Sequence, residues 1–195
     1  MDIINRVKNV LITPKTEWQT IEAENTPYMN VFIPFVVLLA LIPAIAIFIG
    51  YGVIGYSVFG YHIASVSLGI RHAIIQYVAM VGGIYIAAFV INLLAESFGS
   101  RKNFDKAFSL VAYAYTPTFV AGIFYIYHSL VILASLAGIY SLYLLYIGLS
   151  PMMKTPAEKR TSYFIVSLLI MIVALFLLSF ILTAILIGSA YKLQF

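Results

Sequence analysis

The chain has 195 residues, of which 63% are hydrophobic and 9% are charged, and its net charge is +4. Soluble globular domains carry roughly 25% charged residues, so the composition excludes that class and indicates an integral membrane protein. The absence of cysteine from the sequence excludes disulfides and thiolate nucleophiles.

The N-terminal segment, residues 1–27, is the one sizeable polar stretch. Its apolar residues recur at helical spacing and polar residues occupy the other face: Ile3, Ile4, Val7, Val10 and Leu11 against Asn5, Arg6, Lys8 and Asn9. Thr13-Pro14 breaks this helix and opens a second one, in which Trp18 is expected to anchor at the lipid headgroups. We expect interfacial amphipathic helices that act either as a collar or as a docking site for a cytoplasmic protein partner.

Residues 28–195 are expected to form one transmembrane domain. A membrane-spanning helix needs about 20 apolar residues, because the hydrocarbon core is about 30 Å thick and a helix rises about 1.5 Å per residue. Five stretches are long enough: 29–50, 73–95, 107–127, 129–149 and 163–190. Backbone groups in lipid must be satisfied within the segment, so the predicted fold class is all-α, a polytopic bundle of five transmembrane helices.

The distribution of Lys and Arg predicts the orientation. Nine of them fall on one side of the five spans and two on the other: Arg6, Lys8, Lys15, Arg101, Lys102, Lys106, Lys154, Lys159 and Arg160 against Arg71 and Lys192. Short loops rich in these residues stay cytoplasmic. The N-terminus is therefore expected to be cytoplasmic and the C-terminus outside, which makes residues 1–27 a cytoplasmic interfacial segment.

Helix-start signals precede three spans. Thr26-Pro27 precedes the first span, Asn103 the third, and Thr155-Pro156-Ala157-Glu158 matches a capping box ahead of the fifth. The connector at residues 51–71 has no charge until Arg71. We expect it either to re-enter the membrane or to form an interfacial hairpin or short in-plane helix.

Proline and glycine fall near the middle of the first three predicted spans. Pro117 lies about 20 Å along the helix that starts near Asn103 and leaves the carbonyl of Tyr113 without its helical donor. The candidate positions are Pro43, Gly82, Gly83, Tyr113, Tyr115, Thr116, Pro117 and Thr118. They predict either ordinary kinks, repaired by Ser and Thr hydroxyls, or a midplane cavity of the kind that transporters use.

A polar cluster is predicted at the inner interface, where the second span ends: Asn92, Glu96, Arg101 and Lys102. Two interpretations stay open, an interfacial ion pair and a site where an ion or proton is taken up. The sequence places no ionisable residue at depth in a span, which weighs against proton-coupled pumping.

No catalytic, metal-binding or cofactor-binding residue is predicted. His62, His72 and His128 are expected on the outer side, but their spacing matches no metal motif. The sequence contains no Ser–His–Asp set, phosphate loop or HExxH motif. We therefore expect the protein not to be an enzyme and to need no cofactor.

Partners are expected in the membrane rather than among nucleic acids, since the sequence has no RNA- or DNA-binding motif. Basic inner loops favour anionic lipids by about 1 kcal/mol per Lys or Arg. Small residues four apart, Ala134 with Gly138 and Ala184 with Gly188, allow close helix packing within the chain or between copies in a homo-oligomer.

Three stretches resemble one family when taken in order. They are Thr13-Pro14-Lys15-Thr16-Glu17-Trp18, Ala112-Tyr113-Ala114-Tyr115-Thr116-Pro117, and the fourth span with its exit, Gly138 to Lys159. Together with five spans, they resemble the Yip-domain proteins, a membrane family named for Ypt/Rab interaction, in its prokaryotic branch. The signature positions of the exit loop are Gly148, Pro151, Lys154, Pro156, Glu158 and Lys159.

The resemblance implies a multi-pass protein of a prokaryotic plasma or inner membrane, with no implied reaction, substrate or cofactor. Eukaryotic members lie in Golgi and endoplasmic reticulum membranes and associate with one another and with prenylated Rab GTPases. Their N-terminal region is much longer than residues 1–27 here. The expected function is a non-catalytic scaffold that organises membrane or recruits partners; the alternative is a small-solute, ion or lipid transporter with a kinked midplane cavity between spans one to three.

Overall fold

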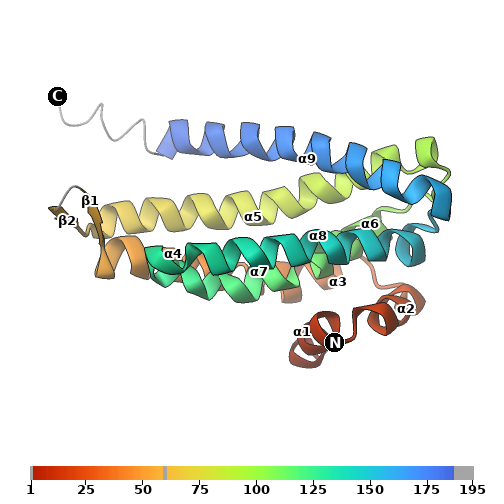
Figure 1. The fold of residues 1–195 in the computed structure, drawn as a ribbon, viewed down its shortest axis with the longest axis horizontal. Helices are drawn as coiled ribbons and strands as arrows, with labels where there is room; N and C mark the ends of the chain where they lie inside the picture. The colour runs from red at the N-terminus through yellow and green to blue at the C-terminus, as the bar shows by residue number, and fades with distance from the viewer. Residues whose placement is uncertain (1, 59–60, 187–195) are drawn as a thin grey trace.

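The computed structural model describes residues 2–58 and 61–186 and confirms the predicted membrane fold, a bundle of helices (Figure 1). Within these residues, five helical segments are long and apolar enough to cross a bilayer: Met29–Ile54, Val66–Leu94, Phe104–Ile126, His128–Met153 and Ala157–Ile185. Each overlaps one predicted stretch. Residues 187–190 of the fifth predicted span, Gly188 and Lys192 lie outside the described residues.

The elements follow one another with short connections. The N-terminal segment and first span contain α1 (Ile3–Ile12), α2 (Pro14–Glu24), α3 (Met29–Val31), the π-helical η1 (Phe32–Val37), α4 (Leu41–Phe48) and η2 (Ile49–Ile54). After them come β1 (Tyr56–Val58), β2 (Tyr61–Ile63), α5 (Val66–Leu94) and η3 (Glu96–Phe98). The third span contains α6 (Phe104–Ala114), α7 (Thr116–Ala121) and η4 (Gly122–Ile126); the fourth and fifth contain η5 (His128–Leu130), α8 (Val131–Met153) and α9 (Ala157–Leu186).

The third span forms the centre of the bundle. Of its most apolar 18-residue stretch 72% is buried, against 11% for the fifth span. Edge-to-face aromatic pairs fill the space between the first and third spans, with ring centroids 4.8 Å apart for Phe35 and Tyr113 and 6.3 Å apart for Phe35 and Phe119. Such pairs add about 0.5–1.5 kcal/mol each to the burial of the rings, so the core is densely aromatic rather than hollow.

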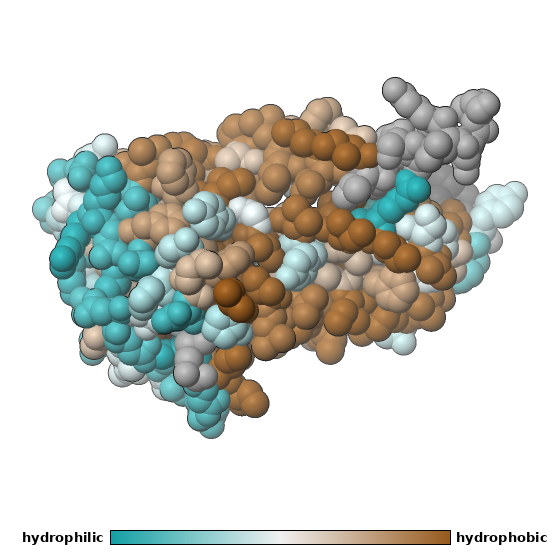
Figure 2. All heavy atoms as spheres, turned by 180° about the vertical axis from the view of Figure 1, so that it is seen from behind, coloured by the Kyte–Doolittle hydropathy of each residue, from teal (hydrophilic) through white to brown (hydrophobic). Residues whose placement is uncertain are grey.

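The two ends of the bundle differ in chemistry. Arg101, Lys102, Lys154 and Lys159 lie at one end, which we call the charged end, and β1 and β2 lie at the other, which we call the hairpin end (Figure 1). Figure 2 shows hydrophilic side chains gathered over the charged end and hydrophobic ones over most of the remaining face. The spans contain 23–29 residues, or about 35–44 Å of helix. They are therefore longer than the hydrocarbon core, about 30 Å thick.

The N-terminal helices pack against the flank of the bundle near the charged end (Figure 1). Two helices separated at Thr13 were predicted, and α1 and α2 confirm them. Val10, Trp18 and Ile21 belong to the same buried core as the spans. The predicted position of Trp18 at the lipid headgroups is wrong, because the indole is only 1% exposed and packs inside the protein.

The connector between the first two spans is shorter than predicted because both helices extend into it. The first span continues to Ile54 and α5 begins at Val66, where the Ser65 hydroxyl accepts a hydrogen bond from the Leu68 amide. Between them, β1 and β2 pair antiparallel, with Tyr56 opposite Ile63 and Ser57 opposite His62. The described residues thus form the hairpin, one of the predicted alternatives; residues 59–60 lie outside them.

Gly122 allows the first and third spans to approach closely. A Cβ added there would lie 2.5 Å from the Pro43 Cβ and 3.0 Å from the Pro43 Cα, which belongs to the backbone. We expect Gly122→Ala to lower the free energy of unfolding by about 1–3 kcal/mol through overpacking, measured by denaturation in detergent micelles. Gly138→Ala is the matched control, since no atom lies within 4 Å of its added Cβ. A Gly122→Ala variant as stable as this control would contradict the close approach.

Candidate functional site

The helices of the first and third spans are interrupted near Pro43 and Pro117. In the first span a turn at Ala40 precedes α4, and Pro43 lies in the first turn of that helix. In the third span α6 ends at Ala114 and Pro117 lies in the first turn of α7, where a missing N–H costs nothing. Gly82 and Gly83 do not break the second span, because α5 is continuous from Val66 to Leu94.

The backbone at Pro117 is repaired by the residue before it. The Thr116 hydroxyl donates a hydrogen bond of 2.6 Å to the carbonyl of Tyr113, which loses its helical donor at Pro117. The amide of Tyr115 donates to Val111, and the amide of Phe119 donates to Tyr115. A threonine hydroxyl that satisfies the freed carbonyl is the ordinary-kink arrangement.

The candidate midplane residues do not converge on one cavity between spans one to three. Tyr113 and Thr116 are fully buried. A Cβ at Gly82 would meet Leu178 and one at Gly83 would meet Leu175, so both glycines face α9. The physical reason is that the centre is already filled by the aromatic side chains of the first and third spans.

Two of the candidates line a different cleft, which opens between α7, α8 and α9. Tyr115 and Thr118 are in its wall together with Ser141 and Gly138, and its volume is about 460 Å³. The hydroxyls of Thr118 and Ser141 are hydrogen-bonded to each other at 2.9 Å. The rest of the wall is largely aliphatic: Ile139, Leu142, Leu145, Leu168, Met171, Ile172 and Leu175.

The predicted inner-interface cluster is only partly assembled. The Lys102 ammonium lies 3.9 Å from the Glu96 carboxylate, and both side chains are well exposed. Such a surface pair is worth about 0–1 kcal/mol. Arg101 is held through its backbone, whose amide donates to the Met153 carbonyl, and the buried Oδ1 of Asn92 has no hydrogen-bond partner among the described residues. The cluster therefore offers a weak ion pair rather than an enclosed site.

The exit loop of the fourth span packs against α2. A Cβ at Gly148 would lie 2.5 Å from Leu110 and 2.9 Å from Trp18, so glycine makes room for the indole. Pro151 lies in the last turns of α8, and Lys154 follows in the left-handed conformation with φ of 54°. The Lys154 ammonium lies 2.9 Å from Glu22, and this hydrogen bond holds the pKa of the Glu22 carboxyl below its usual value.

Thr155 stabilises the end of α8 rather than the start of α9. Its hydroxyl donates to the Leu149 carbonyl at 3.1 Å and accepts from Ser100 at 2.9 Å. The capping box predicted at Thr155 with Glu158 is therefore wrong, because the hydroxyl is already used and Glu158 is exposed. Pro156 and Lys159 flank the same turn near Gly99. Asn103, in contrast, caps α6 as predicted by accepting from the Lys106 amide at 3.0 Å.

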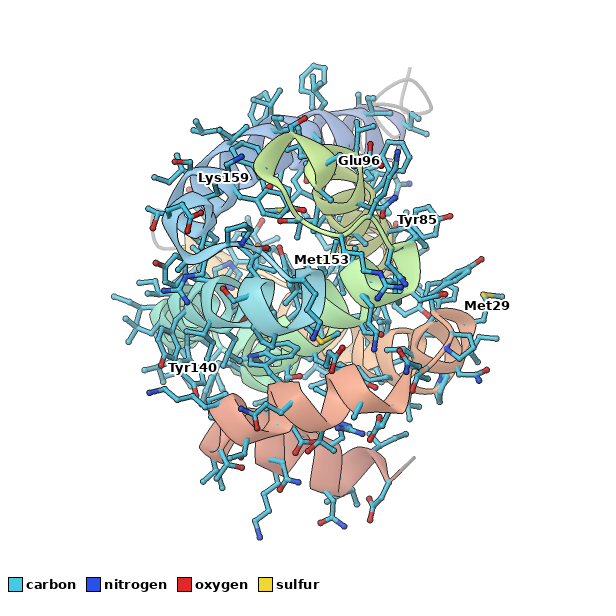
Figure 3. The ribbon with its side chains drawn as sticks, turned by 90° about the vertical axis from the view of Figure 1, so that its right-hand side faces the viewer. Met29, Tyr85, Glu96, Tyr140, Met153 and Lys159 are labelled. Carbon is cyan, nitrogen blue, oxygen red and sulfur yellow. The ribbon has the colours of Figure 1, made fainter. Side chains whose placement is uncertain are left out.

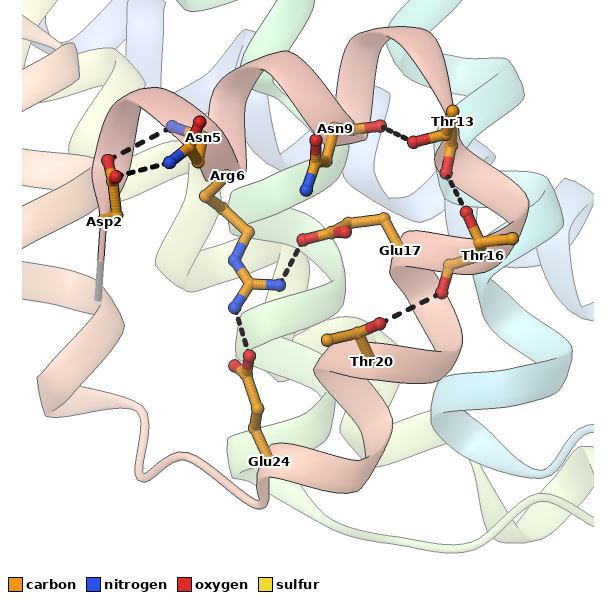
Figure 4. A network of polar contacts seen from close by, with 9 residues as sticks. All are labelled: Asp2, Asn5, Arg6, Asn9, Thr13, Thr16, Glu17, Thr20 and Glu24. Carbon is orange, nitrogen blue, oxygen red and sulfur yellow. Dashed lines mark hydrogen bonds and ion pairs between the residues drawn. The ribbon is translucent and has the colours of Figure 1, made fainter.

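An ionic cluster between α1 and α2, in which Arg6 and Glu17 are buried and Glu24 is exposed, is the main polar feature that sequence reasoning missed (Figure 4). One terminal nitrogen of the Arg6 guanidinium pairs with Glu17 and the other with Glu24. Arg6 is 8% exposed and Glu17 is 7% exposed. Burial lowers the pKa of Arg6, but the hydrogen bond to Glu24 and the nearby charges outweigh it and raise the pKa overall, so the guanidinium stays charged. The signal was the seven-residue spacing of Glu17 and Glu24, which places both on one helical face.

Further contacts join the N-terminal helices to the third and fourth spans. The Arg6 guanidinium lies over the Tyr113 ring at 5.4 Å from its centroid. The Tyr140 hydroxyl donates to the Leu11 carbonyl at 2.8 Å, and the Lys106 ammonium donates to the Glu22 carbonyl. Figure 3 shows Tyr140 beside α1 and α2, with Glu96 and Lys159 on the opposite side of the bundle.

A cavity of about 790 Å³ opens beside the Arg6 cluster, where α1, the end of α2 and the start of the first span meet. Charged side chains of the N-terminal helices and apolar side chains of the first span both line it. Its lining residues are Asp2, Arg6, Glu24, Thr26, Met29, Asn30, Ile33 and Pro34.

The three histidines lie near the hairpin end, and two of them, His72 and His128, belong to a group of aromatic rings. Tyr51 stacks on His72 with centroids 4.4 Å apart and meets His128 edge-on at 4.8 Å. His62 and His128 line a cavity of about 520 Å³. Across residues 2–58 and 61–186, no three His, Asp or Glu side chains are placed to hold a metal ion.

Comparisons with known proteins support the family resemblance that the sequence motifs indicated. The family model of the Yip1 domain matches residues 8–188. The chain is similar to the inner membrane protein YohC of Escherichia coli strain K12 and to its counterpart in strain O6:H1. Each is 31% identical over 186 residues, covering 92% of this chain and 94% of the relative. No solved structure matches the chain.

Proposed function

The chain belongs to the Yip1 domain family, and from that premise we propose that it is a non-catalytic scaffold that associates with copies of itself and with membrane-bound partners. It is a multi-pass protein of the prokaryotic cell membrane, as are the inner membrane relatives. The observation that carries the proposal is that side chains fill the centre of the bundle. The protein therefore offers outer surfaces to partners rather than an internal path to a solute.

The packing of the third span supports a scaffold over a transporter. Tyr113, Thr116 and Phe119 show no exposed surface, although they lie beside the helix break that a transporter would use. Both candidate threonine hydroxyls have a partner within the protein: Thr116 bonds to Tyr113 and Thr118 to Ser141. Polar groups whose hydrogen bonds are already made within the protein gain little by binding a transported solute.

The exposed apolar faces of the last two spans support self-association. Large side chains of α9 such as Phe176 and Phe180 are 69% and 65% exposed within one chain. In α8, Ala134 is buried whereas Gly138 has open space beside it, so the fourth span has room for a close helix–helix contact. A homo-oligomer formed through these faces is part of the proposal.

The charged end is proposed to face the cytoplasm, which places the N-terminus inside and the C-terminus outside. Arg101, Lys102 and Lys159 are exposed there and give the surface the positive charge that cytoplasmic loops carry. We propose that this surface favours anionic lipids and a cytoplasmic protein partner.

Reconstituted vesicles test the scaffold against its transport alternative. We expect vesicles that contain the protein to be no more permeable to ions and small solutes than empty ones, and Thr116→Val with Thr118→Val to leave that permeability unchanged. Fluorescently labelled copies are expected to show energy transfer that falls when unlabelled protein is added. Flux that the double variant abolishes would favour transport, and the absence of energy transfer would contradict self-association.

A further inference from the structure

The cavity beside the Arg6 cluster has the two-sided chemistry of a lipid-binding site. The N-terminal helices contribute Asp2, Arg6 and Glu24 to one wall, and the start of the first span contributes Met29 and Ile33 to the other. Met29 is 46% exposed and Ile33 is 58% exposed. From Ile33 the lipid-facing side of the first span continues through Leu38, Leu41 and Ile45, which are also exposed. A ligand with a polar end and an apolar chain would match both walls at once.

The polar wall has more negative than positive charge. The Arg6 guanidinium is shared between Glu17 and Glu24, so one positive charge faces two carboxylates. Asp2 adds a third carboxylate, and of the three it is Asp2 and Glu24 that line the cavity. Among the described residues, Asp2 accepts hydrogen bonds from the Ile4 and Asn5 amides and the Asn5 side chain. The wall therefore favours a cation, above all one with N–H donors for the remaining carboxylate lone pairs.

Lys106 of the third span is another cation near Glu24, and its ammonium is used elsewhere. Its ammonium donates to the Glu22 carbonyl, and it does not line the cavity. Lys106 therefore acts on Glu24 only as a nearby charge, and the lining of the cavity keeps two carboxylates, Asp2 and Glu24, against the one guanidinium of Arg6.

The cavity also contains donors for a phosphate. The Nε of Arg6 is buried and has no hydrogen-bond partner among the described residues. Figure 4 shows it on the side of the guanidinium away from Glu17. Thr26 and Asn30 line the cavity with a hydroxyl and a side-chain amide. An unpaired buried donor costs about 1–3 kcal/mol, which an oxygen acceptor brought by a ligand would recover.

We propose that this cavity binds the headgroup of a phospholipid that carries both a phosphate and a primary ammonium, as an ethanolamine phospholipid does. The ammonium lies between Asp2 and Glu24, and the phosphate lies on the side of Arg6, Thr26 and Asn30. One acyl chain lies along Met29 and Ile33. This inference is independent of the scaffold role proposed above.

Native mass spectrometry of the full chain tests the proposal. The protein would be purified in mild detergent and mixed with equal amounts of ethanolamine, choline and glycerol phospholipids that have identical acyl chains. We expect the ethanolamine lipid to be retained about tenfold over the other two, because choline has no N–H donor and the glycerol lipid has no cation. Soluble phosphoethanolamine in excess is expected to compete with it.

Two charge-removing variants locate the site. Asp2→Asn removes a carboxylate but keeps a good helix cap, and Glu24→Gln removes the other; each is expected to reduce the preference for the ethanolamine lipid to about even. Glu158→Gln, at an exposed acid of α9 outside the cavity, is expected to retain the preference. Asn30→Trp keeps every charge but fills the cavity from an exposed position, and should lose the lipid without a change in melting temperature.

Three results would overturn the proposal. They are equal retention of the three lipids by the unmodified chain, a preference for the anionic glycerol lipid, and a preference for the ethanolamine lipid that survives in Asp2→Asn and Glu24→Gln.

Discussion

Replacing Arg6 with methionine is expected to lower the free energy of unfolding by about 3–5 kcal/mol, since it leaves a buried carboxylate without its partner. Glu17 is 7% exposed, so its carboxylate has little solvation of its own to offset the lost guanidinium. The variant also loses the cation over the Tyr113 ring. Denaturation in detergent micelles, followed by circular dichroism, measures the change.

The triple variant Arg6→Met, Glu17→Gln, Glu24→Gln separates charge from packing. It removes all three charges together, and replacing a whole buried ionic cluster is often nearly neutral, so we expect it to recover most of the lost stability. Lys8→Met is the matched control on the same helix, because Lys8 is exposed and should change stability by less than about 0.5 kcal/mol. A triple variant as unstable as the single one would show that the side-chain stem of Arg6, and not its charge, holds α1.

The sequence predicts the spans well because the bilayer dictates their length and composition. Met29–Ile54 and Phe104–Ile126 overlap the stretches predicted from apolar residues alone. Local chemistry also predicts the ends of helices: Asn103 caps α6, and Pro117 begins α7. These features depend on neighbours within one turn, and such neighbours are visible in the sequence.

Contacts between distant segments could not be predicted in the same way. The apolar periodicity of α1 placed Arg6 on the polar face, yet Glu17 and Glu24 of α2 bury it. Tryptophan is a residue typical of interfacial anchors, yet Gly148 provides space for the Trp18 indole inside the bundle. In both cases the side chain packs against a partner that belongs to another helix. A single sequence does not show which residues of different helices are in contact.

The candidate site fails to assemble for a related reason. Gly82 and Gly83 can break a helix, but in α5 their missing side chains instead let Leu178 and Leu175 of α9 approach. Thr155 lies in a sequence typical of a helix cap, but its hydroxyl instead forms hydrogen bonds with the carbonyl of Leu149 and the hydroxyl of Ser100. A residue suited to two roles takes the one that its tertiary neighbours make available.

Trp18→Ala is expected to cost about 3–5 kcal/mol, because a large buried side chain is removed from a dense core. The indole is 1% exposed and lies against Gly148 and Leu110. Its Nε1 has no hydrogen-bond partner among the described residues, so the indole stabilises the fold through packing. Denaturation in detergent micelles gives the magnitude, and faster proteolysis near Asn25, between α2 and the first span, would show that the N-terminal segment has detached.

Combining this change with Arg6→Met tests whether α1 and α2 dock as one unit. If they do, either substitution detaches both helices, and the second then removes contacts that are already lost. The cost of the double variant should therefore be well below the sum of the single costs, a coupling of about 0.5–3 kcal/mol between residues that share one structure. Gln19→Ala, next to Trp18 but exposed, should leave both stability and proteolysis unchanged. Strictly additive costs would mean that the ionic cluster and the indole hold the segment independently.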